Sequence, residues 1–413
     1  MADDYQACLD EIFLSYLAVK DRLRGRLDRD VRRPEVILDL ADHLGLIPDP
    51  ARVIRVTGSK GKGTTARLID AILRRETGEA VGLLVSPEER DHTDRIRVGG
   101  RPMTRDDFVA VYTGLRPALG DAAAALPPDG YLSPSGQFLL MALAWFQRSG
   151  VRHMVLETGR GARHDEVGRL ASATAVVTSI LDEHVGYLGP TDADIAADKL
   201  AIGGTAGLTV MSPGAEAWRQ RLGLAFPVDV AAPGDGPDGV PAWYAADQAL
   251  AARAAAHHLG RPAVAPGGDV LTASFGRTRA FGREICYEAV VAAESLDMAF
   301  LRALKRRHGD GLTAVASLPD DKDVMGVAEA IDGAGIALRF VALTGERGFL
   351  DHRQAEVRLG DRIIGRVAFD DAPALAECLG RVVADDGPTA LYLLGTQTFI
   401  RLARRILAGE NRS

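Results

Sequence analysis

The sequence predicts an α/β protein of two domains, each built on a parallel β-sheet that helices cover. The first observation is the length, because 413 residues exceed what a single hydrophobic core normally serves. The second is the alternation of short β-branched runs with amphipathic segments along most of the chain. The third is a glycine-rich turn at 57–65, which joins such a run to such a helix. We therefore expect a first domain at 1–280, with N-terminal helices, and a smaller Rossmann-like α/β domain at 281–413.

The first domain is expected to begin with helices and to continue with buried strands. Apolar residues recur at helical spacing between Tyr5 and Leu17, including Tyr16, which predicts a helix that covers the core. A second helix is expected at 34–44. The expected strands are 53–57, 80–85, 153–157 and 175–180, with a loop at 120–136 and an apolar helix at 138–146. Because parallel strands carry ligands at their carboxyl ends, those ends should meet at one edge of the sheet.

A shorter alternation predicts the second domain. A surface loop is expected at 231–241, an alanine-rich helix at 248–259 and a hinge at 275–281. The expected strands are 289–292, 313–317, 338–343 and 390–394, and the expected helices are 298–307, 324–331 and 399–407.

Composition narrows the class of function. The net charge is −7 and no stripe of Lys and Arg dominates, which argues against a nucleic-acid partner. The cysteines Cys8, Cys286 and Cys378 lack the spacing of a metal site. Acidic residues such as Asp3 and Asp4 exclude a signal peptide, and no apolar run reaches the length of a membrane-spanning helix. We expect a cytoplasmic protein without a membrane partner.

The turn after the first strand has the properties of a phosphate-binding loop. It reads Thr57-Gly58-Ser59-Lys60-Gly61-Lys62-Gly63-Thr64-Thr65, and an amphipathic helix follows it. Backbone N–H groups at a helix start bind oxyanions, and glycines let the backbone approach them closely. The ammonium of Lys62 and the threonine hydroxyls would reach the phosphates. A glycine-rich helix start without a ligand is the structural alternative, but the flanking strand and helix favour a bound nucleotide.

Polar residues also stand at the carboxyl ends of the neighbouring strands. Ser86 follows the strand 80–85, Glu157 ends the strand 153–157, and Asp182-Glu183-His184 follow the strand 175–180. In a parallel sheet these ends lie at the same edge as the phosphate loop. The sequence therefore predicts that they share one site.

Further motifs follow in a fixed order. They are Ser86-Pro87, 94–100, 156–159 with Gly161, Arg163 and Asp165, 183–199, Gly276-Arg277, Asp321-Lys322-Asp323 and 394–396. The phosphate loop has only Ser59 and Lys60 between Gly58 and the Gly61-Lys62 pair, where the general nucleotide motif has four residues. This series resembles the Mur ligase superfamily, and most closely its folylpolyglutamate synthase/dihydrofolate synthase branch.

The resemblance implies an ATP-dependent, ADP-forming amide ligase, which activates a small-molecule carboxylate as an acyl phosphate for attack by an amino acid or another amine. It implies ATP and Mg²⁺ as cofactors and a carbamylated lysine at Lys199. The implied catalytic residues are Lys62, His184 and Lys199, the implied metal ligands are Ser86, Glu157, His184 and Lys199, and the implied nucleotide contacts outside the loop are Gln248 and Arg277. The structural alternatives are a helix cap for Ser86, a surface carboxylate for Glu157, a loop histidine for His184 and a solvated lysine for Lys199.

Several departures from the family pattern concern the substrates. Glu88 replaces a histidine, the loop 158–166 is short, Ala251 stands where an asparagine is expected, and 291–297 lacks the motif Asp-Gly-Ala-His-Asn-Pro. The short loop carries Arg160, Arg163 and His164, which suit a small or polyanionic carboxylate better than a flat ring stacked on apolar walls. We therefore expect the acid substrate not to be a pteroate.

Other functions stay open at this point. One is a dihydrofolate/folylpolyglutamate synthase that adds glutamate. Another, from a different class, is a catalytically inactive nucleotide-binding partner protein, because the motif of the second domain is missing. A generic P-loop kinase is disfavoured by the spacing of the loop. The joint presence of Lys62, Glu157, His184 and Lys199 favours the ligase.

Overall fold

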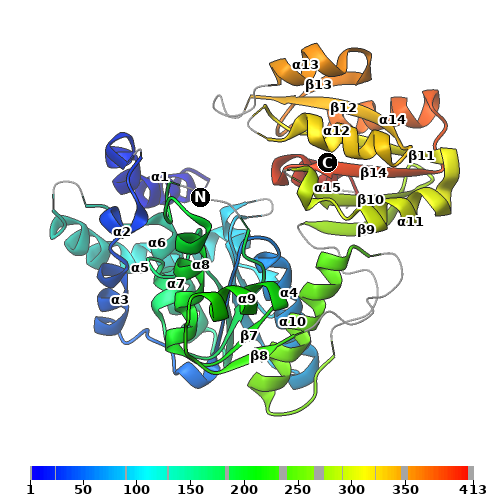
Figure 1. The fold of residues 1–413 in the computed structure, drawn as a ribbon. Helices are drawn as coiled ribbons and strands as arrows, with labels where there is room; N and C mark the ends of the chain where they lie inside the picture. The colour runs from blue at the N-terminus through cyan, green and yellow to red at the C-terminus, as the bar shows by residue number, and fades with distance from the viewer. Residues whose placement is uncertain are drawn as a thin grey trace. The chain divides into compact units, whose positions relative to one another are not determined.

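Helices and strands alternate along the whole chain, and they form two units, each with its own β-sheet (Figure 1). The computed structural model describes residues 2–23, 25–88, 91–127, 130–181, 186–231, 240–264, 274–290, 292–320, 322–345 and 352–407. The first unit comprises residues 1–234 and 246–266, and the second comprises 235–245 and 267–413. The expected α/β class with two domains is confirmed.

An eight-stranded sheet organises the first unit. Its spatial order is β4 (Arg101–Pro102), β3 (Ile96–Val98), β2 (Val81–Leu84), β5 (His153–Glu157), β1 (Val53–Thr57), β6 (Ser172–Val177), β7 (Ala206–Met211) and β8 (Val228–Val230). In this spatial order, neighbouring strands pair in parallel from β2 through β5, β1, β6 and β7 to β8. Strands β3 and β4 add an antiparallel edge next to β2. The sequence did not predict that edge, because strands of three and two residues carry too little periodicity.

Helices cover both faces of this sheet. They are α1 (Ala2–Val19), α2 (Asp28–Val31), α3 (Pro34–His43), α4 (Lys62–Thr77), α5 (Arg105–Ala124), α6 (Pro134–Arg148), α7 (Glu166–Arg169), α8 (Asp192–Leu200), α9 (Pro213–Arg221) and α10 (Ala242–Leu259), with short 3-10 helices η1 (Lys20–Leu23), η2 (Pro50–Arg52), η3 (His92–Arg95) and η4 (Ala201–Thr205). All five residues of the central strand β1 are buried, as expected for a strand covered on both sides.

Two expectations for the helices need correction. The segment 120–136 is a loop only in part, because α5 continues to Ala124 and α6 begins at Pro134. The buried face of α5, which includes Phe108 and Leu119, stabilises the helical conformation of its glycine- and alanine-rich C-terminal end. In α1, the side chains of Tyr16 and Leu17 are 37% and 44% exposed and lie outside the buried face.

A six-stranded sheet organises the second unit. Its order is β13 (Ile363–Ala368), β12 (Ala337–Thr344), β11 (Leu312–Ser317), β14 (Ala390–Gly395), β10 (Arg283–Ala289) and β9 (Phe275–Ala280), parallel except for the β9–β10 pair. The helices are α11 (Met298–His308), α12 (Val324–Gly333), α13 (Arg353–Leu359), α14 (Ala372–Asp385) and α15 (Gln397–Leu407), with 3-10 helices η5 (Ala293–Ser295), η6 (Gly309–Gly311) and η7 (Gly360–Arg362). Separate apolar clusters cover its two faces.

The expected hinge at 275–281 is a strand of a hairpin, and the strand expected at 289–292 lies at 283–289 instead. Phe281 and Gly282 have φ values of 53° and 70°, the signature of a two-residue hairpin turn. Because β9 pairs with β10 from end to end, it belongs to the second sheet. The last division between the compact units accordingly falls at residue 266, whereas the domain boundary expected from the sequence is at 280.

Within the described ranges, no helix is both long enough and apolar enough to cross a membrane. The three cysteines are free and buried.

Candidate active site

The loop after β1 turns sharply into α4, and its glycines make the turn possible. Gly58 and Gly61 have φ values of 137° and 93°, in the range that favours glycine. A Cβ atom added to Gly58 would lie 2.1 Å from the hydroxyl oxygen of Thr178, and one added to Gly61 would lie 2.3 Å from Oδ1 of Asp247. Gly61 is also the N-cap residue of α4. Both the backbone shape and the close packing therefore require glycine at these positions.

The residues after β6 hold the phosphate loop in place. The backbone N–H of Ser59 donates to the carbonyl of Ser179 at 2.7 Å, and the N–H of Lys60 donates to the Ser179 hydroxyl at 2.9 Å. The hydroxyl of Thr178 in turn donates to the carbonyl of Lys60 at 2.7 Å. The loop is thus fixed to the neighbouring strand before any ligand binds.

Two lysine ammonium groups converge on one carbonyl of the loop. Lys62 donates to the carbonyl oxygens of Gly58 at 3.0 Å and Ser59 at 3.2 Å. Lys199, on α8, donates to the same Gly58 carbonyl at 3.0 Å and to that of Arg160 at 3.3 Å. Lys199 is fully buried, so its interpretation as a solvated lysine is wrong. Two positive charges at the loop favour a polyanionic ligand.

The first turn of α4 offers further groups for such a ligand. Thr64 and Thr65 are buried, and the hydroxyl oxygen of Thr64 has no hydrogen-bond partner in the part of the chain that the structure describes. A buried hydroxyl without a partner costs free energy. The N–H groups at a helix start also lack partners within the helix. Phosphate oxygens would satisfy both kinds of donor, so the residues present fit a nucleotide polyphosphate.

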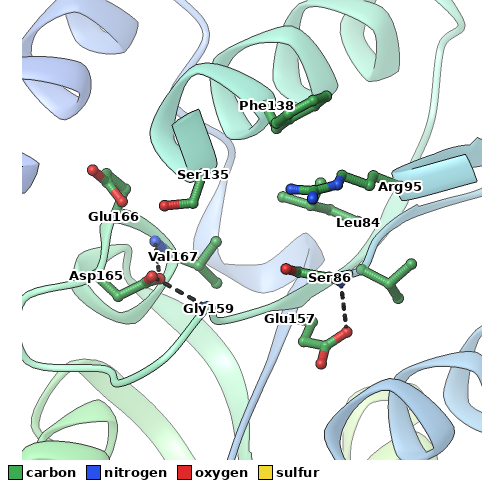
Figure 2. Close-up of a pocket in the computed structure, with 11 residues that line it drawn as sticks. Leu84, Ser86, Arg95, Ser135, Phe138, Glu157, Gly159, Asp165, Glu166 and Val167 are labelled. Atoms are coloured by element: carbon green, nitrogen blue, oxygen red, sulfur yellow. Dashed lines mark hydrogen bonds between the residues drawn. The ribbon is translucent and has the colours of Figure 1, made fainter. Parts of the chain in front are cut away.

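Glu157 ends β5 and lies beside the phosphate loop. Its side chain is 4% exposed, and Oε2 accepts a hydrogen bond from the backbone N–H of Ser86 at 3.0 Å (Figure 2). Burial raises the pKa of Glu157 to about 7, although Lys62 opposes this shift. A Cβ atom on Gly63 would lie 3.3 Å from Oε2. A buried carboxylate beside a phosphate loop fits a hard divalent cation such as Mg²⁺, and it is not the surface carboxylate of the structural alternative.

The structure describes only some of the other residues that the sequence predicts for the site. His184 lies outside the described residues, as do Asp182, Glu183 and Asp321. Gln248 is half-buried on α10 in the first unit. Arg277 belongs to β9 in the second unit, where its guanidinium donates to Glu284 at 2.7 Å. Among the residues that the structure describes, no group of three or more His, Cys, Asp or Glu side chains could hold a metal ion.

A small cavity of about 20 Å³ opens beside Glu157, with room for roughly one water molecule (Figure 2). Its lining residues come from β2 and the residues after it, η3, β5, α6 and the segment around α7. They are Leu84, Val85, Ser86, Arg95, Ser135, Phe138, Glu157, Gly159, Asp165, Glu166 and Val167. The cavity therefore adjoins Glu157, the residue that fits a divalent cation.

A buried ion cluster forms one side of the cavity. The guanidinium of Arg32 donates to Glu166 at 2.7 Å and to the hydroxyl of Ser135 at 3.1 Å, and it lies 3.5 Å from Asp165. Asp165 also accepts the N–H of Gly159 at 3.1 Å. Burial raises the pKa of Asp165 to about 6, although Arg32 opposes the shift. Nothing in the sequence points to Arg32, because a single arginine before a helix is usually exposed.

Arg95 and Phe138 form another side of the cavity (Figure 2). The guanidinium carbon of Arg95 lies 4.6 Å from the centre of the Phe138 ring, and the His92 ring stacks on Phe138 at 5.9 Å. Arg95 also pairs with Glu88 at 2.6 Å. Although burial opposes it, His92 and Arg95 hold the pKa of Glu88 well below its ordinary value. The residue that departs from the family pattern, Glu88, thus fixes a cation against the aromatic ring.

The three basic residues of the loop after β5 do not line this cavity. Arg160 pairs with the buried Asp28 at 3.0 Å, and its guanidinium lies 4.1 Å from the ring centre of Tyr187. Arg163 donates to a backbone carbonyl, and burial lowers the pKa of His164. These basic residues therefore do not line the cavity as a binding site for a polyanionic acid would require, because the arginines have local partners.

Known proteins resemble the chain in parts of their sequence. No family model matches. A probable bifunctional folylpolyglutamate synthase/dihydropteroate synthase of Haloferax volcanii is 37% identical over 168 residues, which are 41% of this chain and 20% of that protein. The dihydrofolate synthase/folylpolyglutamate synthase of Escherichia coli is 31% identical over 189 residues, 46% of this chain and 42% of that one. The chain thus spans less than half the length of these relatives.

Solved structures resemble nearly the whole chain. Folylpolyglutamate synthase of Mycobacterium tuberculosis, complexed with ADP and AMPPCP, has a TM-score of 0.71 at 21% identity and covers 97% of this chain and 99% of its own. FolC of E. coli in complex with DHPP and ADP has a TM-score of 0.69 at 19% identity, with coverage of 92% and 94%. At these identities the likeness establishes the fold.

Proposed function

We propose that this chain, which has the fold of the folylpolyglutamate synthases of the Mur ligase superfamily, is an ATP-dependent, ADP-forming ligase that joins a carboxylate to an amino acid or another amine. The observation that carries the proposal is the phosphate loop itself. It combines a helix start with the buried hydroxyl of Thr64, the ammonium group of Lys62 and the buried Glu157 within one site. The named relatives are synthases of this kind, which supports the same chemistry here.

In the proposed reaction, the phosphates of ATP lie at the start of α4. Lys62 exchanges its carbonyl partners for γ-phosphoryl oxygens, where negative charge shifts during transfer. A carboxylate oxygen of the acid attacks the γ-phosphorus and ADP leaves. The amine then attacks the acyl carbon, phosphate leaves and the nitrogen loses a proton. Glu157, Ser86 and His184 would hold Mg²⁺, which supplies positive charge to the phosphates.

The carbamate at Lys199 is part of the same proposal. The ammonium group of Lys199 first loses a proton, and CO₂ then adds to the neutral amine with release of a second proton, so that a cation becomes a carboxylate. Full burial keeps the amine away from bulk water. The present partners of Lys199, the carbonyls of Gly58 and Arg160, accept from an ammonium group, so a carbamate would have to turn toward other groups. It would then serve as a ligand for a second Mg²⁺ or orient the acid substrate.

We further propose that the acid is not a pteroate. The guanidinium of Arg95 occupies a face of Phe138, where a flat ring would otherwise stack, and Glu88 fixes it there. A dihydrofolate/folylpolyglutamate synthase is the second candidate, favoured by the names of the relatives.

An inactive nucleotide-binding protein is the third candidate. It is favoured by the segment after β10, where Asp297 caps α11 by accepting the N–H groups of Ala299 and Phe300 and therefore has a structural role. Against it stand Lys62, Glu157 and Lys199, since a protein that only binds nucleotide needs no buried carboxylate beside the loop.

A screen of carboxylates against amines with Mg·ATP tests these candidates. The measured products are ADP, AMP and phosphate, and dihydropteroate with glutamate is one of the pairs. ADP release that needs both an acid and an amine supports the ligase, and AMP release contradicts an acyl phosphate. Turnover of dihydropteroate at about 1 s⁻¹ or more, an ordinary enzyme rate, would overturn the second part of the proposal. Nucleotide binding without turnover of any pair would favour the inactive protein.

A further inference from the structure

Asp247 is a buried carboxyl group beside the phosphate loop that the proposed reaction does not use. It lies in the second turn of α10 and is 4% exposed. A Cβ atom on Gly61 would lie 2.3 Å from Oδ1 and 2.5 Å from Oδ2, so the carboxyl group packs directly on the loop glycine. Across the described residues, Oδ2 of Asp247 has no well-aligned hydrogen-bond partner, and the neighbouring hydroxyl of Thr65 interacts with the carboxyl group. The carboxyl group is therefore placed against the residue that caps α4.

The charge of this group matters for a loop that binds phosphate. A buried carboxylate without a paired cation costs several kcal/mol. Burial raises the pKa of Asp247 well above its ordinary value, against the opposing effects of Thr65 and Lys60. Lys60, in the loop, is the charged group that faces it. A neutral carboxyl group packs on the loop without repelling a polyphosphate, whereas an ionised one would add a negative charge next to it.

We propose that Asp247 is a positioning residue for the nucleotide: its carboxyl group packs on Gly61 and keeps the first turn of α4 in the shape that receives phosphate. It acts through the loop and makes no contact with the ligand. The inference rests on the proposed nucleotide function. It predicts that α10 contributes to ATP affinity through Asp247, one residue before the Gln248 that the family resemblance singles out.

Three variants separate this role from a general effect on folding. Asp247→Asn keeps the shape and the neutral state, so ATP should bind within about twofold of the wild-type affinity. Asp247→Leu removes the polar group, and we expect ATP to bind about tenfold more weakly, the loss of roughly one hydrogen bond or its equivalent. Arg253→Ala, on the same helix but 54% exposed and 3.4 Å from Asp229, is the matched control and should bind ATP normally.

The measurements are the Kd of a fluorescent ATP analogue and, once a substrate pair is known, KM and kcat. In Asp247→Leu, KM for ATP should rise while kcat changes little. In the wild-type protein ATP binding should weaken as the pH rises through the pKa of Asp247, and in Asp247→Asn this dependence should vanish. Identical pH profiles for the two proteins would overturn the proposal, and they decide the question even if Asp247→Leu does not fold.

A wild-type protein that binds no ATP at all contradicts the proposed function. A wild-type protein that binds ATP, with Asp247→Leu binding equally well, contradicts only the role of Asp247.

Discussion

At the scale of single residues, Lys62 contributes little to the stability of the fold, but we expect it to stabilise the negative charge on the transferred phosphoryl group. Its ammonium group contacts only carbonyl groups of its own loop among the hydrogen bonds described for it, at 3.0 and 3.2 Å. We expect Lys62→Ala to fold normally and to lose ADP formation by a factor of about 10² to 10³, as for other groups that stabilise developing charge. Circular dichroism and turnover, measured together, check this. Lys305→Ala, which removes an exposed ion pair with Asp310, is the control. Substantial activity in Lys62→Ala would exclude the lysine from the mechanism.

The ionisation of the buried Glu157 makes the folding stability of the protein depend on pH. Its pKa rises on folding from 4.5 to about 7, so the folded state holds the proton more tightly than the unfolded state. The stability it contributes is complete below pH 4.5 and is lost as the pH rises through 7. The shift corresponds to at most roughly 3 kcal/mol. Glu157→Gln should therefore be the more stable protein at pH 8 and should lose most of this pH dependence. Urea unfolding at pH 5 and pH 8 measures the effect.

The same variant also tests the metal site. Glu157→Gln should require far more Mg²⁺ for activity while ATP still binds the loop. An unchanged Mg²⁺ requirement would show that Glu157 is not a ligand.

Lys199 tests the carbamate. Lys199→Ala should lose activity by about 10² or more, since a group near the transferred phosphoryl is missing. Bicarbonate should not restore it, whereas a short carboxylic acid should restore a part. Nuclear magnetic resonance of the wild-type protein with ¹³C-labelled bicarbonate, Mg²⁺ and nucleotide at neutral pH checks the modification. Absence of a carbamate signal under those conditions would contradict the proposal.

The sequence reveals some parts of the site and not others. The phosphate loop is readable because its glycines, lysine and threonines are consecutive and their roles are local. Arg32 and Asp247 are not readable, because each acquires its role from burial against residues more than a hundred positions away. The basic residues of the loop after β5 suggested a binding site for a polyanionic acid. The sequence does not show that Arg160 pairs with the distant Asp28, which removes it from such a role.

At the scale of elements, helix α6 and strand β2 pack too closely for any side chain at Gly82. A Cβ atom there would lie 2.9 Å from the ring of Phe146. We expect Gly82→Ala to lower the free energy of unfolding by about 1–3 kcal/mol, the cost of overpacking a core. Gly114→Ala is the matched control in the exposed face of α5, where nothing lies within 4 Å of the added atom. It should raise the stability by about 0.5–1 kcal/mol. Denaturant unfolding of both proteins checks the opposite signs.

The elements that the sequence predicts well are those with a full period of buried residues. Strand β1 is buried at every position and α11 is amphipathic along its length, and both have the expected bounds within one residue. The hairpin of β9 and β10 was missed because its central signal is the dipeptide Phe281-Gly282, and phenylalanine rarely adopts a positive φ. The edge strands β3 and β4 are defined by pairing partners that a sequence does not display.

At the scale of the whole molecule, each unit has its own sheet and its own apolar clusters. We expect two unfolding transitions rather than one. ATP at a hundred times its Kd should stabilise the first unit by about 2.7 kcal/mol and leave the second transition nearly unchanged. Trp145 and Trp218 lie in the first unit and Trp243 in the second, so variants that keep tryptophan in one unit only report on each transition separately. A single transition in both reporters would contradict independent units.

The contact of Arg95 with Phe138 has a consequence for how the ligand preference of this cavity could evolve. The aromatic surface is intact, and a side chain anchored seven residues away, by Glu88, covers it. Few mutations therefore separate the present cavity from one with a bare ring, and all of the relevant codons lie within the short stretch 88–95. If the proposed function is correct, a small combinatorial library over Glu88, His92 and Arg95 is the most economical starting point for admitting bulkier acids.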